Sequence, residues 1–238
     1  MMKKITGDSA TGVAQASKIL VWDAPVRVFH WLMVLCFAGA YLTAESEKWR
    51  LVHVTLGYTL GGLVAFRFIW GIVGTRYARF ASFLTSPLAV LRYVRSMFSH
   101  KPEHHVGHNP AGAVAIVLLL LLSVVIVASG WAVYNDVGGH WLETLHEGAS
   151  NAMLLVVAVH VAGVVVASWL HRENLVRAML TGKKEGAPNQ GIQRTWSWLA
   201  GVIIVAVMGF WWFQWQAAPS NTAVSQNVTI SSLTIGSV

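Results

Sequence analysis

The chain has 238 residues, of which 55% are hydrophobic and only 11% are charged, and its formal net charge is +7. A soluble domain usually carries about 25% charged residues, so the composition excludes an ordinary soluble protein and indicates a membrane protein. The positive charges fall in short segments between apolar runs, where they orient a membrane protein, and so they do not indicate nucleic-acid binding.

The N-terminal segment, residues 1–20, is polar at its start and lacks the apolar core of a cleavable signal peptide. We expect this segment to lie in the cytoplasm and the first apolar run to act as an uncleaved signal-anchor. Cys36 is the single cysteine, so no disulfide can form within the chain. Since no C-x-x-C-H motif is present either, covalent attachment of a haem is excluded. Cys36 lies in an apolar run, and we expect it to pack in the core.

Five apolar segments are long enough to cross a bilayer as helices. They cover residues 26–44, 51–73, 111–134, 149–170 and 196–215. Arg67 lies inside the second segment, where a charge is costly unless it faces a partner. The fold prediction is therefore an all-α integral membrane protein, with a four-helix bundle over residues 21–182 and an additional transmembrane helix over 195–216.

Charge in the connections predicts the orientation of the helices. The connection after the third segment is acidic, whereas those after the second and fourth are basic. The basic residues are Arg76, Arg79, Arg92, Arg95 and Lys101 in the first case and Arg172, Arg177, Lys183, Lys184 and Arg194 in the second. We therefore expect a cytoplasmic N-terminus, a cytoplasmic linker over residues 183–194, and a flexible external tail over 217–238.

Within the first basic connection, residues 88–98 carry apolar side chains at helical spacing beside Arg92 and Arg95. This pattern suits a short helix lying on the cytoplasmic interface. A solvated linker with chance periodicity is the alternative.

Four histidines lie in or beside the apolar segments: His30, His53, His146 and His160. Fourteen residues separate His146 from His160, which is almost four turns of a helix, so both share one face about 21 Å apart. The predicted orientation places His53 with His146 in the outer leaflet and His30 with His160 in the inner leaflet. His30 and His160 can lie at the same depth in the membrane only if the first helix begins early. Pro25 in the first turn of this helix would allow such a start.

Two imidazoles on facing helices are what a bis-histidine haem iron needs, and two such pairs would make a two-haem path across the bilayer. A mononuclear zinc site would want three or four ligands at one depth, and only two are found at each level. Gly57 and Gly61 follow His53 at helical spacing, and glycine lets a flat macrocycle approach the backbone. Plain packing of helices through small residues is the alternative.

The two propionates of haem b want cationic partners. Arg27 and Arg67 are the candidates on the inner side, and Lys48 and Arg50 on the outer side. For Arg27 the alternative is a cytoplasmic positive charge with no ligand. His140 and His171 are expected at the membrane interface. The other four histidines, His100, His104, His105 and His108, lie in the polar segment K-P-E-H-H-V-G-H-N-P, which we expect to be a solvated loop. A metal site in this loop is the alternative.

Several motifs resemble the prokaryotic cytochrome b561 family, and in particular the cytochrome b subunits of nickel–iron hydrogenases. These motifs are V-W-D-A-P-V-R-V-F-H-W at 21–31, H-V-T-L-G-Y at 53–58, R-F-I-W-G-I-V-G at 67–74, R-F at 79–80 and G-H-N-P-A-G at 107–112. The resemblance implies a four-helix membrane bundle with two non-covalent b haems. Its ligand positions match His30, His53, His146 and His160. The fifth helix and the tail depart from this pattern.

The resulting functional hypothesis is a di-haem electron carrier of the bacterial inner membrane. It would pass electrons between membrane quinone and a periplasmic redox partner, either a c-type cytochrome or a hydrogenase-like enzyme. We expect no catalytic residue of its own, and His171, Glu173 and Arg177 are the candidates for a quinone site.

Two other functions stay open. One is a stand-alone superoxide:quinone oxidoreductase of the same family, with Lys48 and Arg50 attracting the anion, although the acidic outer loop argues against it. The other is a haem-free anchor or transporter, although the sequence lacks the inverted repeat and broken helices typical of transporters.

Overall fold

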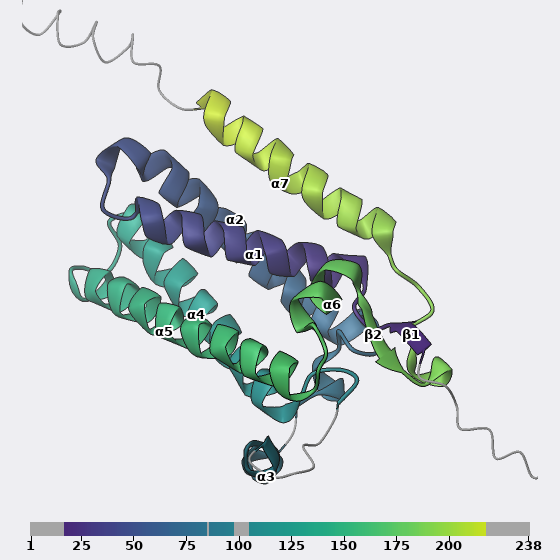
Figure 1. Ribbon diagram of the computed structural model, residues 1–238. Coiled ribbons are helices and arrows are strands. Elements are labelled where there is room, and N and C mark those ends of the chain that lie inside the picture. Colours follow the sequence, from purple (N-terminus) through teal and green to yellow (C-terminus); the bar gives the residue numbers. More distant parts are fainter. Residues whose placement is uncertain (1–16, 85, 98–104, 218–238) are drawn as a thin grey trace, which may run out of the picture.

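The computed structural model describes residues 17–84, 86–97 and 105–217 (Figure 1). Five of its helices are long and apolar enough to cross a membrane. They are α1 (Ala24–Thr43), α2 (Arg50–Val73), α4 (Pro110–Tyr134), α5 (Trp141–Leu170) and α7 (Ser197–Ala217). The prediction of an all-α, multi-pass membrane protein with five spans is confirmed.

The first four long helices form a bundle, and α7 lies outside it. α4 packs along α5, α1 packs along α2, and α2 also faces α4. Figure 1 shows α7 on the outer side of this bundle, where it packs mainly on α1. The core between α1 and α2 contains the fully buried Cys36 beside Leu56, Leu60 and Leu63, so the prediction that Cys36 packs in the core is confirmed.

Two spans begin earlier than predicted. The side chain of Asp23 accepts a hydrogen bond from Val26 N at 2.8 Å and caps α1, with Pro25 in the first turn, so the helix begins at Ala24 rather than at 26. α5 begins at Trp141 rather than at 149. Its first turns are amphipathic and acidic, which lowers hydropathy without preventing a helix. His146 therefore lies within α5 and not before it.

A small cap at one end of the bundle was not predicted. Strand β1 (Ser17–Leu20) pairs antiparallel with β2 (Lys183–Gly186), and the short helix α6 (Leu175–Thr181) leads into β2. Gly182 joins α6 to β2 with a φ of +79°, and its carbonyl accepts hydrogen bonds from both Val21 N and Trp22 N. A side chain there would meet the carbonyl oxygen of Trp22, so this turn requires glycine.

Single-turn 3-10 helices complete the architecture, namely η1 (Glu47–Trp49), η2 (Phe80–Ser82) and η3 (Pro188–Gln190). The predictions for residues 1–16 and for the tail from 218 onwards lie outside the described residues.

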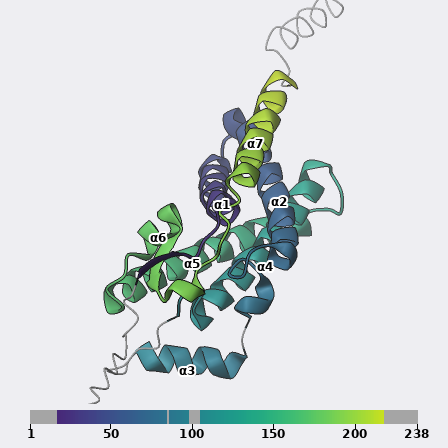
Figure 2. The same ribbon diagram turned by 90° about the vertical axis from the view of Figure 1, so that its right-hand side faces the viewer.

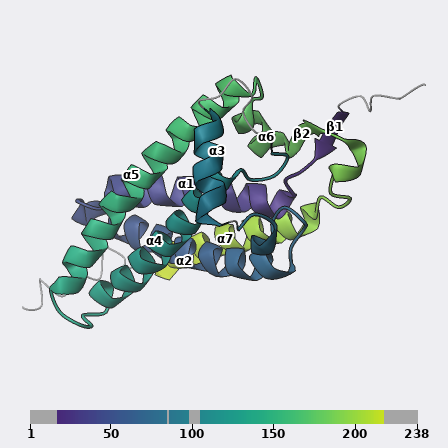
Figure 3. The same ribbon diagram turned by 90° about the horizontal axis from the view of Figure 1, so that it is seen from below.

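The short helix predicted over residues 88–98 is present as α3 (Pro87–Met97). α3 is seen end-on in Figure 1 and side-on in Figure 2, whereas α1 runs side-on in Figure 1. Seen from below in Figure 3, α3 crosses the direction of α1 and α2. Tyr93 is 1% exposed, while Leu88 and Leu91 are exposed on the same helix. This arrangement suits a helix parallel to the membrane surface.

Candidate functional site

The rings of His53 on α2 and His146 on α5 face each other, with their centroids 6.2 Å apart and their planes at 72°. A metal–imidazole nitrogen bond is about 2 Å long, so two imidazoles on opposite sides of one metal ion have ring centres about 6 Å apart. His53 and His146 lie on different helices and are 93 positions apart in the sequence. With this spacing, His53 and His146 could together hold one metal ion.

Each of these rings is oriented by a backbone carbonyl. His53 Nδ1 donates to the oxygen of Ala40 at 2.8 Å, and His146 Nδ1 donates to the oxygen of Ile126 at 3.0 Å. Because a carbonyl can only accept, the proton must reside on Nδ1 in both rings, and Nε2 keeps its lone pair. Histidines that bind metals almost always show this arrangement, since it fixes the tautomer and raises ligand basicity.

Three glycines near this pair have different roles. A Cβ at Gly130 on α4 would lie 2.8 Å from Cε1 of His146, so glycine lets the ring approach α4. A Cβ at Gly61 would lie only 2.9 Å from a methyl group of Val127, so glycine allows close packing of α2 on α4. A Cβ at Gly57, one turn after His53, would meet nothing within 4 Å. Of the two glycines predicted to admit a macrocycle, Gly57 has open space beside it.

The second pair, His30 on α1 and His160 on α5, lies within electrostatic range but makes no ring contact in the part of the chain that the structure describes. Nδ1 of His30 is buried without a hydrogen-bond partner, and its ring meets Trp31 edge-on at 5.1 Å. The early start of α1 places His30 nearly two turns inside the helix. His30 and His160 therefore lie in one region of the bundle, but their rings are not in contact as those of His53 and His146 are.

Arg67 is buried, with a relative exposure of 3%, and it lies within electrostatic range of His108, as do His30 and His160. Its guanidinium lies 4.7 Å from the ring centre of Phe80, and the charge of Asp23 attracts it. Asp23 is itself 1% exposed and accepts hydrogen bonds from Trp70 Nε1 at 3.1 Å and Thr75 Oγ1 at 2.6 Å. Nη1 of Arg67 has no hydrogen-bond partner. A buried donor without an acceptor suggests that a bound group completes this region.

Arg27, the other predicted inner cation, ties α1 to the cap. Its Nη1 donates to the carbonyl oxygen of Leu180 at 2.6 Å, near the end of α6. Nε of the same guanidinium is buried without a partner. Part of this side chain therefore serves the fold, and one donor remains available for a ligand.

His108 is not in a solvated loop, and that prediction is wrong for this residue. Its ring lies 4.4 Å from the ring of Trp22 and 4.6 Å from that of Phe83, and its Nδ1 is buried without a partner. Burial, together with the positive charges of Arg67 and Lys184, lowers the pKa of His108 to about 3. The imidazole is therefore neutral at physiological pH.

The rest of the predicted histidine loop is only partly described. His105 is partly buried beside Tyr93, at 5.5 Å between ring centres, whereas His100 and His104 lie outside the described residues. Within the described ranges, no group of three or more His, Cys, Asp or Glu side chains could hold a metal ion.

The residues predicted for a quinone site take different places. Glu173 forms an ion pair with Lys184 at 3.2 Å, and Lys184 Nζ also donates to the oxygen of His105 at 3.1 Å. His171 ends α5, and Arg177 is exposed on α6. Lys184 therefore joins β2 both to Glu173, after α5, and to the loop before α4.

At the other end of the bundle, the outer cations are exposed. Lys48 lies 5.8 Å from the ring centre of Trp49, and Arg50 pairs with Glu47 at 3.6 Å. His140 is exposed and its Nδ1 lies 2.8 Å from Oε2 of Glu143, as expected for an interfacial residue.

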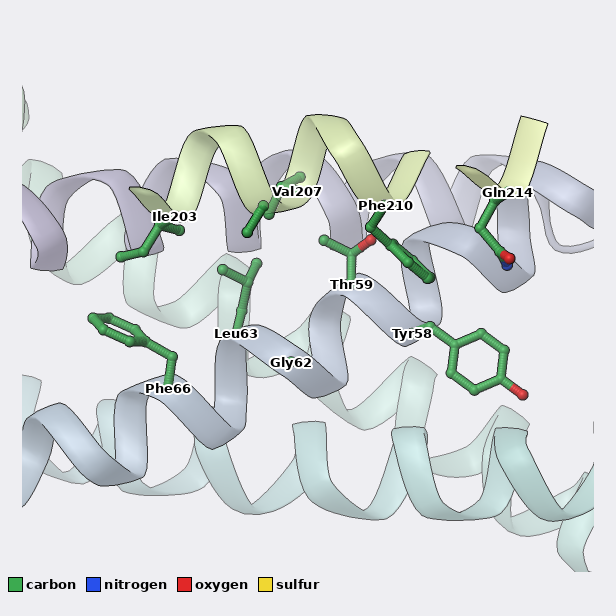
Figure 4. A pocket seen from close by; sticks show the side chains of 10 residues that line it. Tyr58, Thr59, Gly62, Leu63, Phe66, Ile203, Val207, Phe210 and Gln214 are labelled. Atoms are coloured by element: carbon green, nitrogen blue, oxygen red, sulfur yellow. The ribbon is translucent and has the colours of Figure 1, made fainter. Parts of the chain in front are cut away.

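A groove of about 590 Å³ lies between α2 and α7 (Figure 4). Its walls are mostly aliphatic and aromatic, and Trp211 Nε1 donates to Thr59 Oγ1 at 2.8 Å beside it. Gly62 lines this groove nine residues after His53, which is half a turn away around α2. The groove is therefore separate from the face that carries His53.

Comparison with known proteins gives one family match. The family model described as "Prokaryotic cytochrome b561" matches residues 21–182. A probable Ni/Fe-hydrogenase B-type cytochrome subunit of Rhodobacter capsulatus is 22% identical and is aligned over 76% of this chain and 88% of its own length. A protein of the same description from Escherichia coli (strain K12), for hydrogenase 1, is 28% identical over 49% of this chain and 60% of its own. No solved structure matches the chain significantly.

Proposed function

Because the chain belongs to the prokaryotic cytochrome b561 family, we propose that it carries electrons through two b-type haems, one held by His53 and His146 and one by His30 and His160. Membership of the family makes the chain a membrane cytochrome b that transfers electrons across the membrane. The number of haems, their ligands, the quinone and the partner are the proposal.

The observation that carries this proposal is the relationship between His53 and His146. Their ring centres are 6.2 Å apart, and each Nδ1 is engaged by a backbone carbonyl, so both Nε2 atoms are left to bind iron. Packing alone does not require two histidines on different helices to bring their rings this close, each with its Nδ1 bound to a carbonyl. The open space at Gly57 supports a macrocycle beside this pair.

For the inner haem the support is electrostatic. Haem b brings two carboxylates, and the buried nitrogen atoms without partners near His30 and His160 are donors of the kind that carboxylates accept. We assign Arg67, with Arg27, to the propionates of the inner haem. Their positive charge would offset the cost of burying those carboxylates.

A bound haem iron would supply one-electron chemistry, and the chain would determine its potential and its accessibility. Carbonyls of α1 and α4 orient the rings of His53 and His146, which would limit rearrangement of these ligands. The apolar core around Leu56 and Leu60 keeps water away from α1 and α2. A rigid, dry surrounding favours fast electron exchange.

We propose that membrane quinone exchanges electrons at the inner face and that a periplasmic redox protein does so at the outer face. The basic connections and the acidic loop before α5 support a cytoplasmic N-terminus and a periplasmic C-terminus in a bacterial inner membrane. The relatives are described as hydrogenase cytochrome subunits, which supports a hydrogenase-like partner. An acidic outer loop would equally attract a basic c-type cytochrome.

The test is a dithionite-reduced minus oxidised spectrum of the purified full chain, with haem counted per chain. We expect two non-covalent b haems in the wild type and close to one in each of His53→Ala and His160→Ala. His140→Ala is the matched control, because His140 is exposed and its ring contacts the exposed Glu143. One haem in the wild type, or unchanged content in a variant, would contradict the pairing.

A further inference from the structure

His108 lies in the loop before α4, and its ring packs against two aromatic rings. Trp22 and Phe83 pack against it at 4.4 and 4.6 Å between ring centres. Nδ1 nevertheless remains buried and without a hydrogen-bond partner. Buried polar atoms in native proteins nearly always have a partner, so this nitrogen requires one that the residues described by the structure do not supply.

The neighbouring residues hold the loop in place without using His108. A Cβ at Gly107 would lie 2.7 Å from Cδ1 of Tyr77, so only glycine allows the loop to pack this closely. Asn109 accepts a hydrogen bond from Gly112 N at 2.7 Å and caps α4. The sequence G-H-N therefore places a histidine between two positions with structural roles, and leaves the imidazole free to bind something else.

The surroundings of His108 are positive. Arg67, Lys184, His160 and His30 all lie within electrostatic range of its ring. Lys184 is already paired with Glu173. Arg67 Nη1 has no acceptor, and both carboxylate oxygens of Asp23, its nearest charge partner, are engaged by Val26 N, Trp70 and Thr75. One region near the inner pair therefore contains two nitrogen atoms without acceptors.

In the tautomer that carries its proton on Nδ1, His108 needs an acceptor at this position, and the positive charges of Arg67 and Lys184 favour an anionic one. A neutral imidazole offers one N–H, and a guanidinium offers several, so together they suit the two oxygens of a carboxylate. The inner haem, on which this inference rests through the proposed function, brings such groups to this end of the bundle. We propose that His108 acts with Arg67 to bind a propionate of the inner haem.

This contact has a consequence for the inner haem alone. A hydrogen bond to the propionate withdraws negative charge from the neighbourhood of the iron and so favours its reduced form. Loss of the donor should therefore lower the midpoint potential of the inner haem. The outer haem, between His53 and His146 at the other end of α5, should not respond.

The experiment compares His108→Phe with His108→Gln in the purified full chain. Phenylalanine keeps the aromatic packing between Trp22 and Phe83 but has no donor, whereas glutamine keeps a donor. Redox titration in a His53→Ala background reports the inner haem, and titration in a His160→Ala background reports the outer one. We expect His108→Phe to lower the inner potential or to lose that haem selectively, His108→Gln to stay near the wild-type value, and the outer potential to stay constant.

Three outcomes would overturn the inference: an unchanged inner potential in His108→Phe, an equal shift at both haems, or equal losses of the inner haem in the Phe and Gln variants. The last two would show that His108 serves only the fold. The background variants separate this failure from failure of the proposed function. If His53→Ala and His160→Ala did not each remove one haem, the haem assignment itself would be wrong.

Discussion

Trp70 Nε1 donates a hydrogen bond to the carboxylate of Asp23 at 3.1 Å, and this contact joins the last turn of α2 to the start of α1. The same carboxylate caps α1 through Val26 N and accepts from Thr75 Oγ1. One acidic side chain therefore fixes two helices and balances the buried charge of Arg67.

Replacing Asp23 with Ala should destabilise the protein. Loss of an N-cap costs about 0.5–2 kcal/mol, and an unpaired buried donor such as Trp70 Nε1 adds about 1–3 kcal/mol. We expect a clearly lower midpoint of thermal unfolding in detergent, and a smaller loss for Asp23→Asn, which can still cap α1. Glu45→Ala, at an exposed position, is the control. An Asp23→Ala variant as stable as the control would show that the Asp23 contacts contribute little.

Substituting Gly130 should affect the outer haem. In Gly130→Val, the new side chain would occupy the space of the His146 ring, whose Cε1 lies 2.8 Å from a Cβ at that position. We expect the haem content of the purified protein to fall toward one per chain. Gly201→Val on α7 is the matched control, because a Cβ there meets nothing within 4 Å. Full haem content in Gly130→Val would indicate that His146 does not hold a haem in this position.

The fifth helix should contribute to stability but not to the haem sites. Trp211→Phe removes the hydrogen bond from Trp211 Nε1 to Thr59 Oγ1. Hydrogen bonds between membrane helices are worth about 0.6 kcal/mol on average, so a double-mutant cycle with Thr59→Val should give a coupling energy of that order. Haem content and spectrum should stay unchanged, because α7 lies outside residues 21–182. A loss of either haem in Trp211→Phe would show that α7 does contribute to the haem sites.

The buried imidazole of His108 predicts a pH dependence of stability. Its pKa is lowered from 6.5 to about 3 in the folded protein, so between these values the unfolded chain binds a proton that the folded chain does not. Stability should therefore fall as the pH is lowered from about 6.5. His108→Gln has no titrating group and should show a shallower decline in the unfolding midpoint between pH 7 and pH 5. Parallel curves for the two proteins would mean that His108 is not neutral in the folded state.

The spans were predictable because they depend on local patterns. Hydropathy marks α4 strongly, and the fourteen-residue spacing of His146 and His160 follows from helix geometry alone. The first turns of α5 were missed because Glu143 and Glu147 lower the hydropathy that identifies a span. The strands of the cap were missed because Lys183 and Lys184 show no apolar alternation.

His108 shows what local patterns cannot provide. Its sequence neighbours are polar, and this favours a solvated loop. Its burial comes from Trp22 and Phe83, which are distant in the chain and meet it only after α1 and α2 have packed. The partner of Arg67 was predicted to exist, but its identity as Asp23 depends on the same packing.

The pairing of β1 with β2 has a further meaning for how this protein is assembled. Leu20 lies opposite Lys183, so the segment that matches the family, residues 21–182, begins and ends at the β1–β2 strand pair. The β1–β2 pair does not isolate this segment from the residues that follow it. Ala24 N, at the start of α1, donates to the oxygen of Thr195, and Ile203 of α7 is buried in one core with Cys36 and Leu60. Residues beyond the strand pair therefore share the packing of α1 and α2, so truncating the chain after β2 would expose part of that core to lipid.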